Sequence, residues 1–94
     1  MRTIEYAKAF KKDFKRVKAT PRHARDAEKL LAAALELLVA DNPLPTANRD
    51  HVLTGNWSGY RECHVKPDLL LIYSKPDDTT LRLARLGSHS ELFG

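Results

Sequence analysis

The chain has 94 residues, of which 43% are hydrophobic and 30% charged, and its net charge is +4. This length allows one domain (residues 1–94) with one core, and this composition excludes a disordered tail. The single cysteine, Cys63, excludes an internal disulfide and fits a reducing compartment. The first residues contain no apolar run of signal-peptide length, so we expect a cytoplasmic protein without a membrane partner.

Positive charge is concentrated near the N-terminus. Residues 8–25 hold eight basic side chains against one acid, Asp13, so this segment carries +7 and the remaining residues sum to −3. Such a concentration is typical of contact with nucleic acid, an anionic membrane surface or an acidic protein, although a solvated helix face would carry the same charge. The basic face expected on the first helix comprises Lys8, Lys11, Lys12, Lys15, Arg16 and Lys18.

The first predicted elements are a short strand and a helix. Residues 2–6 alternate weakly between polar and apolar, as in a strand. Tyr6, Phe10, Phe14 and Val17 then recur at spacings of four, four and three, which predicts an apolar helix stripe that packs in the core.

A second helix is predicted from about Pro21 to about Ala40. Thr20 is a good N-cap and Pro21 a good first helical residue, so the pair ends one helix and starts the next. Two prolines within residues 41–50 then exclude helix, and we expect a loop that delivers His51.

The second half of the chain predicts three strands. Residues 60–65 alternate, with Glu62 and His64 on one face, while residues 69–73 are apolar on both faces, as in a central strand. Residues 81–86 make the last strand. Cys63 lies on the opposite face from His64, where we expect it to act as a small buried hydrophobe.

The order β-α-α-β-β-β predicts an α+β domain, with an antiparallel-rich sheet and two helices on one face. No helix remains to cover the other face of the sheet. We therefore expect polar side chains there, among them His64, to line an open cleft, with Glu62 orienting His64.

Three of the four histidines, His51, His64 and His89, lie in the second half of the chain beside charged residues. Imidazole gives and takes protons near neutral pH, so these residues, with Asp68 and several arginines, predict acid–base chemistry on a polyanion. The same groups are plausible metal ligands, but they lack a characteristic zinc spacing, so we expect no metal and no cofactor. His23, at the start of the second helix, is expected on the surface.

The residues from 50 onward form an extended motif. It reads DH-x-L-x-G-x-W-x-x-Y-R over residues 50–61, then H-x-x-P-D over 64–68, and ends with G-x-H at 87–89 and LF at 92–93. This pattern resembles the YafQ-type toxins of the RelE/ParE superfamily. The resemblance implies a RelE-like fold and a messenger-RNA endonuclease that acts on the ribosome and is silenced by a cognate antitoxin.

Matching the motif residue by residue implies roles for individual side chains. Leu69 stands where the best-known relative has a tryptophan, which removes an aromatic platform for base stacking at that position. The implied catalytic residues are His51, His64, Asp68 and His89, and the implied substrate-binding residues are Arg61, Arg85 and Phe93.

These groups would support RNA cleavage without a metal. In our hypothesis His89 is the general acid and Arg85 binds the phosphate through its planar guanidinium. His51, His64 and Asp68 form the base side, and the sequence does not separate their roles. Phe93 is placed to stack on a base.

Two other functions remain open at this point: a non-enzymatic, ParE-like topoisomerase poison and a binding module of the same fold. The resemblance also implies partners. These are an antitoxin that is acidic where it meets the basic face, the ribosome and its messenger RNA, and operator DNA only in complex with the antitoxin.

Overall fold

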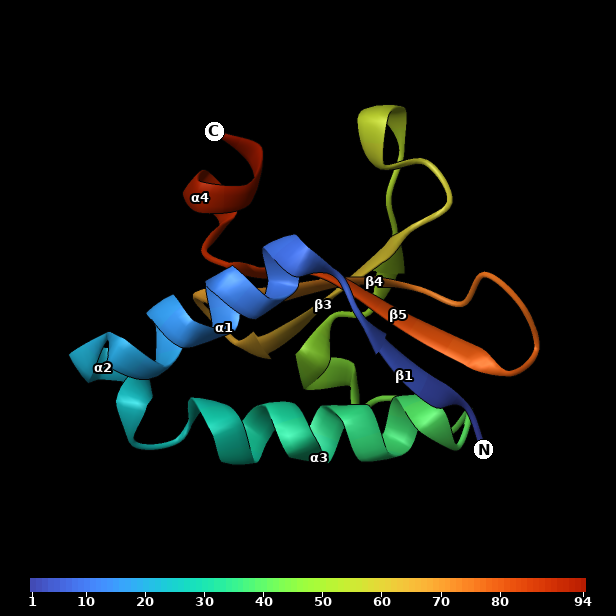
Figure 1. The fold of residues 1–94 in the computed structure, drawn as a ribbon, viewed down its shortest axis with the longest axis horizontal. Helices are drawn as coiled ribbons and strands as arrows, with labels where there is room; N and C mark the ends of the chain where they lie inside the picture. Colours follow the sequence, from blue (N-terminus) through green and yellow to red (C-terminus); the bar gives the residue numbers. More distant parts are fainter.

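The computed structural model describes residues 1–94 and shows an α+β fold, as predicted (Figure 1). No helix in it is long and apolar enough to cross a membrane. The elements of the first half are β1 (Thr3–Tyr6), α1 (Lys8–Ala19), α2 (Pro21–Ala24), α3 (Ala27–Val39) and the 3-10 turn η1 (Thr46–Asn48). Those of the second half are β2 (His51–Val52), the 3-10 turn η2 (Gly55–Trp57), β3 (Arg61–Lys66), β4 (Leu69–Ser74), β5 (Thr80–Gly87) and α4 (His89–Phe93).

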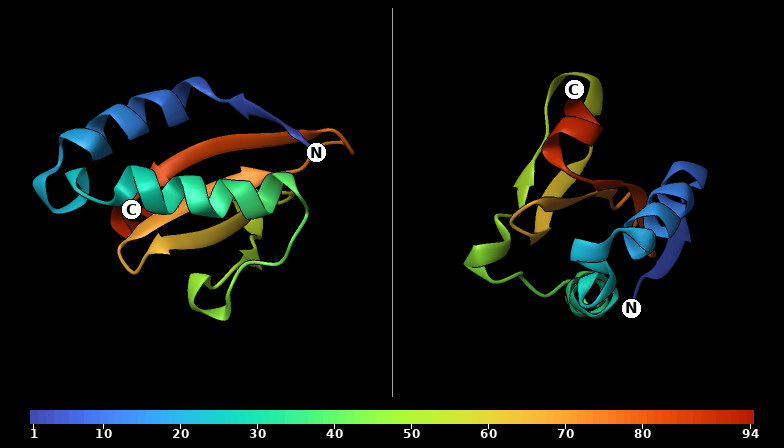
Figure 2. Two further views of the ribbon diagram at one scale, coloured as in Figure 1. Left: turned by 90° about the horizontal axis from the view of Figure 1, so that it is seen from below. Right: turned by 90° about the vertical axis from the view of Figure 1, so that its left-hand side faces the viewer.

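The five strands form one sheet in the order β1-β5-β4-β3-β2. Only β1 and β5 pair in parallel, and the other three pairs are antiparallel, so the sheet is antiparallel-rich as predicted. All six residues of β4 are buried, because both faces of this central strand are covered. The first and last strands of the chain lie side by side (Figures 1 and 2).

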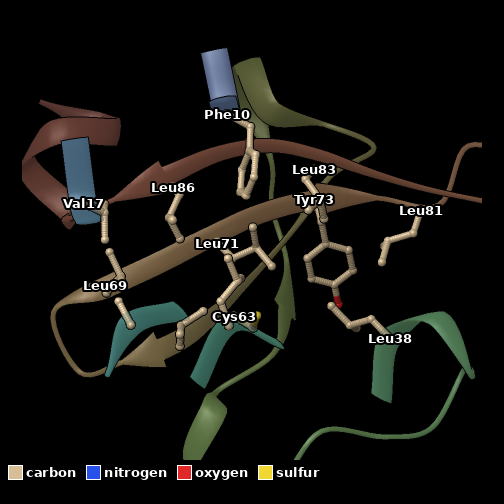
Figure 3. Close-up of a cluster of buried hydrophobic side chains, with 13 residues drawn as sticks. Phe10, Val17, Leu38, Cys63, Leu69, Leu71, Tyr73, Leu81, Leu83 and Leu86 are labelled. Atoms are coloured by element: carbon tan, nitrogen blue, oxygen red, sulfur yellow. The ribbon is translucent and has the colours of Figure 1, made fainter. Parts of the chain in front are cut away.

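The main core lies between the sheet and helices α1 and α3, where 13 buried residues form one cluster (Figure 3). The predicted stripe of α1 is confirmed at Phe10 and Val17, which are 1% and 2% exposed. Tyr6 belongs instead to β1 and is 48% exposed. The stripe therefore begins one helical turn later than its spacing predicted.

The predicted helix over residues 21–40 is wrong in one respect, because it is broken between α2 and α3. Lys66 Nζ donates to the carbonyl of Arg22 and to the carboxylate of Asp26, both at 2.9 Å. The Asp26 amide bonds the carbonyl of His23 instead of Arg22. A lysine from β3 thus takes the acceptor that would have continued the helix.

The expectation that no helix covers the second face of the sheet is also wrong. The short helix α4 places Leu92 against Leu70, Ile72 and Ala84 on that face. Its start is a capping box between Ser88 and a glutamate three residues later, a spacing that is visible in the sequence. In Figure 1, α4 and the loop that carries η2 both rise from the side of the sheet opposite α3.

Candidate active site

Two imidazoles on the second face share one buried carboxylate. His51 pairs with Glu62 across β2 and β3, and His64 follows Glu62 by two residues on the same face. Glu62 is only 4% exposed. Its Oε1 lies 3.5 Å from Nε2 of His51 and 3.7 Å from Nε2 of His64. This face therefore holds one carboxylate with two imidazoles close by, at distances slightly longer than a hydrogen bond.

The loop before β2 fixes the ring of His51. Asn48 donates to the carbonyl of His64 at 2.8 Å, and Arg49 then adopts a left-handed conformation with φ of 50°. Nδ1 of His51 lies 2.7 Å from the Arg49 carbonyl, which accepts only, so Nδ1 carries a proton. The other nitrogen, Nε2, is thereby directed at Glu62.

Asp50 holds the same loop to the core. The hydroxyl of Tyr73 donates to Asp50 at 2.5 Å, and Arg61 binds the same carboxylate at 3.2 and 3.3 Å. The bond to Asp50 raises the pKa of Arg61. Arg61 pairs with Tyr73 across β3 and β4, on the face opposite Glu62 and His64. The structure therefore does not bring Arg61 to the imidazoles.

Asp68 lies in the turn between β3 and β4, with its side chain half exposed. It pairs with Arg22 at 3.5 Å and lies 4.0 Å from Nε2 of His23. No hydrogen bond or ion pair joins Asp68 to the three other predicted catalytic residues. The prediction for His23 is wrong, because α2 packs it against the rest of the protein and leaves it 4% exposed.

His89 and Phe93 lie one turn apart on α4, with ring centroids 5.0 Å apart, and both are exposed. The strand register relates them to the imidazole pair, because His64, Leu70 and Gly87 stand opposite one another on β3, β4 and β5. Two strand spacings, about 10 Å, separate His64 from Gly87, which lies two residues before His89 at the start of α4. Helix α4 packs on the same face through Leu92, and no hydrogen bond or ion pair joins His89 to His64.

Arg85 is held by the buried carboxylate of Asp13. Its Nε lies 2.6 Å and its Nη2 3.2 Å from the two Asp13 oxygens, and this bonding raises the pKa of Arg85. The side chain keeps 28% of its surface exposed. Asp13 therefore fixes the edge of the guanidinium formed by Nε and Nη2, and Nη1 forms no hydrogen bond within the protein.

The basic face predicted for α1 divides into two kinds of residue. Its five lysines are exposed, and none forms an ion pair. Arg16 instead binds Asp13 at 2.9 Å and Glu91 of α4 at 3.3 Å. The lysines are thus free to bind an anionic partner, whereas Arg16 ties α1 to α4.

Cys63 is fully buried, and burial raises the pKa of its thiol to about 12, so the prediction of a small buried hydrophobe is confirmed. No group of three or more His, Cys, Asp or Glu side chains has the arrangement of a metal site. No pocket is found on the protein, so the open cleft expected beside His64 is not observed.

Glu62 is the residue that sequence reasoning undervalued. The alternation of β3 placed it beside His64, but its burial and its contact with His51 depend on the pairing with β2. The signal in the sequence was a glutamate between two histidine-bearing segments. The position of this glutamate indicates a site only when the pairing of β2 with β3 is known.

Comparison with known proteins gives a consistent family. Residues 2–94 match the family described as "Bacterial toxin of type II toxin-antitoxin system, YafQ". The mRNA interferase toxin YafQ of Escherichia coli strain K12 is 43% identical over 93 residues, which cover 99% of this chain and 97% of that protein.

Two solved structures extend the likeness to the fold. The YafQ of the Escherichia coli DinJ–YafQ complex superposes with a TM-score of 0.84 at 42% identity, covering both chains fully at 100%. A metal-bound toxin from Helicobacter pylori superposes with a TM-score of 0.85 at 47% identity, covering 99% of this chain and 100% of that one. The chain therefore belongs to the YafQ family of bacterial type II toxin–antitoxin toxins.

Proposed function

We propose that the protein is an mRNA interferase, a ribosome-dependent endoribonuclease that cuts messenger RNA by metal-independent acid–base chemistry. The observation that carries this proposal is the buried carboxylate of Glu62 between the imidazoles of His51 and His64. Imidazole and carboxylate groups that lie close together are typical of general acid–base sites. The named activity of the Escherichia coli relative supports the same assignment.

The proposed reaction is an internal transesterification of RNA. A base removes the proton of a ribose 2′-hydroxyl, whose oxygen bonds to the adjacent phosphorus while the bond to the 5′-oxygen breaks. An acid donates a proton to that leaving oxygen. The products are a 2′,3′-cyclic phosphate, which water can open to a 3′-phosphate, and a 5′-hydroxyl. Each positioned proton-transfer group typically contributes about 10²–10⁴-fold.

The exposed imidazole of His89 serves as the acid in this proposal, and the network of His51, Glu62 and His64 serves as the base side. Asp68 remains a proposed member of the base side, because its half-exposed carboxylate is accessible to RNA from the turn after β3. One edge of the Arg85 guanidinium is free for phosphate.

Two positions bear on base recognition. Phe93 is 37% exposed beside His89, so its ring offers a face to an unstacked base. Leu69 is 1% exposed in the main core and offers no surface to RNA. Base stacking in this proposal therefore falls to Phe93.

The five exposed lysines of α1 are the proposed contact with ribosomal RNA phosphates. Helix α1 is joined to α4 by the pair between Arg16 and Glu91, so the basic face continues toward the proposed site. Reversing Lys11, Lys12 and Lys15 to glutamate should weaken ribosome binding and flatten its dependence on salt. Unchanged association would refute this contact.

A cognate antitoxin is the proposed protein partner, supported by the DinJ–YafQ complex of the Escherichia coli relative. The same five lysines, none of which pairs with a carboxylate of the chain, would favour an acidic segment of that antitoxin. Competition between antitoxin and ribosome for this face would make inhibition and substrate binding mutually exclusive.

Mapping of RNA 5′ ends on translating ribosomes tests the proposal. The wild type should create new 5′-hydroxyl ends within messages, and His89→Ala and Asp68→Ala should lose them. Asp78→Ala is the matched control, because Asp78 is exposed and takes part in no ion pair. A ligation step specific for 5′-hydroxyl ends separates this chemistry from two-metal hydrolysis, in which water attacks in line and leaves a 5′-phosphate.

The same assay distinguishes the other functions. Growth inhibition that survives combined His64→Ala and His89→Ala substitution, without new RNA ends, would indicate a non-enzymatic poison. A chelator selective for zinc and copper, used in buffer that keeps the magnesium of the ribosome, should leave cleavage unchanged. Loss of cleavage that added copper or zinc restores would contradict a reaction independent of these metals.

A further inference from the structure

Asp13 is an unusual residue for its position, because it is the one acid in the basic segment of residues 8–25 and it is only 3% exposed. Four donors surround its carboxylate. Arg85 donates at 2.6 and 3.2 Å, Arg16 at 2.9 Å and the backbone amide of Leu86 at 2.9 Å. A buried network of paired charges is often replaceable as a whole by apolar side chains without loss of stability, so its presence here suggests a functional reason.

The geometry of Arg85 supplies such a reason. Asp13 occupies the edge of the guanidinium formed by Nε and Nη2, so Nη1 and the exposed part of the group remain free. An arginine on an open surface loses side-chain freedom when it binds a phosphate. Here that freedom is already lost in the folded protein, and the guanidinium plane is set before RNA arrives.

A second arm of the network reaches α4. Arg16 donates to the Leu86 carbonyl at 3.1 Å and pairs with Glu91 at 3.3 Å. Glu91 in turn accepts from the Ser88 amide at 2.8 Å and so forms the cap that starts α4. A five-residue helix is not stable alone, and these contacts fix the segment that carries His89.

A side chain at Gly87 would crowd the pair between Arg16 and Glu91. A Cβ at Gly87 would lie 3.0 Å from Nη2 of Arg16 and 3.0 Å from Oε1 of Glu91. Glycine at this position therefore lets Arg16 cross from Asp13 to Glu91. The glycine of the G-x-H motif thus favours the pair between Arg16 and Glu91.

We propose that Asp13 is a positioning residue for RNA cleavage, which orients Arg85 directly and, through Arg16, the helix that carries His89. This inference rests on the proposed function. Burial alone would raise the pKa of Asp13, but the bonds from Arg85, Leu86 and Arg16 outweigh burial and hold it below its ordinary value. The carboxylate is therefore charged at neutral pH, as an anchor for two arginines must be.

Asp13→Asn tests the direct effect of Asp13 on Arg85. The substitution keeps the shape of the side chain and one acceptor for the Leu86 amide but removes the charge. Single-turnover cleavage on saturating ribosomes should slow by about 10–100-fold, while the Kd for ribosomes stays within about twofold. Arg85→Ala should slow cleavage by about 10²–10³-fold. The double variant should be no slower than Arg85→Ala alone, because residues that act as a unit are not additive.

Asp41→Asn is the matched control, since Asp41 also binds two cations, Arg2 and Lys75, but lies away from the site. It should cleave at the wild-type rate. An unimpaired Asp13→Asn, or a double variant in which the two losses multiply, overturns the role of Asp13. Absence of cleavage by the wild type refutes instead the proposed function, and with it this inference.

Arg16→Met keeps the proposal testable if Asp13→Asn is too unstable to purify. The substitution keeps an unbranched apolar stem and removes the guanidinium that joins Asp13 to Glu91. It should slow single-turnover cleavage by about 3–10-fold, with ribosome affinity unchanged. The NMR signal of the Arg85 Nε–H group should stay at its wild-type position in this variant. An unchanged cleavage rate overturns the proposal.

Discussion

Two regions of the protein each bury one carboxylate, and they treat it in opposite ways. Where α1 meets β5, Asp13 is surrounded by four donors at 3.2 Å or less. On the second face of the sheet, Glu62 is buried to the same degree, but its partners are imidazoles at 3.5 and 3.7 Å. The first carboxylate is fixed as an anion. The second lies beside groups that exchange protons, and this difference separates a positioning role from a chemical one.

Glu62→Gln gives the largest expected effect, because it removes the charge shared by the two imidazoles. Cleavage on ribosomes should fall by about 10²–10³-fold, in the range of one lost proton-transfer group. The free energy of unfolding should stay the same or rise by about 1 kcal/mol, since a buried charge without short hydrogen bonds is lost. Single-turnover kinetics and urea denaturation measure the two quantities. A variant that cleaves normally would remove Glu62 from the site.

Asp13→Asn, unlike Glu62→Gln, should lower the stability of the protein. The free energy of unfolding at neutral pH should fall by about 1.5–3 kcal/mol, because hydrogen bonds to charged groups are lost and two arginines lose their counter-charge. Urea denaturation measures this loss. Asp41→Asn, with an exposed carboxylate, should cause a smaller loss. Equal losses in the two variants would mean that the burial of Asp13 has no energetic consequence.

The pH dependence of stability sharpens this difference. The folded-state pKa of Asp13 lies below its ordinary value of 3.8. Its stabilising contribution is therefore complete above about pH 4 to 5 and is lost as the pH falls through the folded-state pKa. The difference in free energy of unfolding between wild type and Asp13→Asn should thus become smaller below pH 4, as measured by urea denaturation at a series of pH values. If this difference in free energy stays constant between pH 7 and pH 3, the charge of Asp13 does not cause it.

Local patterns predicted the strands well. The alternation of β3 placed Glu62 and His64 on one face, and the continuous apolar run of β4 marked a central strand. These features depend on neighbouring residues alone, so the sequence displays them directly. The spacing from Ser88 to Glu91 was equally visible, and reading it as a capping box would have predicted α4.

Contacts between distant residues could not be predicted in the same way. The break between α2 and α3 depends on Lys66, which lies 40 residues beyond Asp26 in the chain. The burial of Asp13 depends on Arg85, which lies 72 residues away. A charged residue on a basic helix face is usually solvated, so only the fold shows that this one is not.

The smallest expected effect concerns the loop that delivers His51 to Glu62. Tyr73 is 1% exposed, and its hydroxyl donates to Asp50 at 2.5 Å from within the main core. Tyr73→Phe removes this hydroxyl without leaving a large cavity, and Asp50 keeps its pair with Arg61. The free energy of unfolding should fall by about 1 kcal/mol, measured by urea denaturation. Cleavage should slow by about threefold to tenfold, since a small displacement of the loop moves His51 relative to Glu62. A stability loss without any change in cleavage would mean that Arg61 alone is sufficient to hold the loop. The bond from Tyr73 to Asp50 would then stabilise the fold without positioning His51.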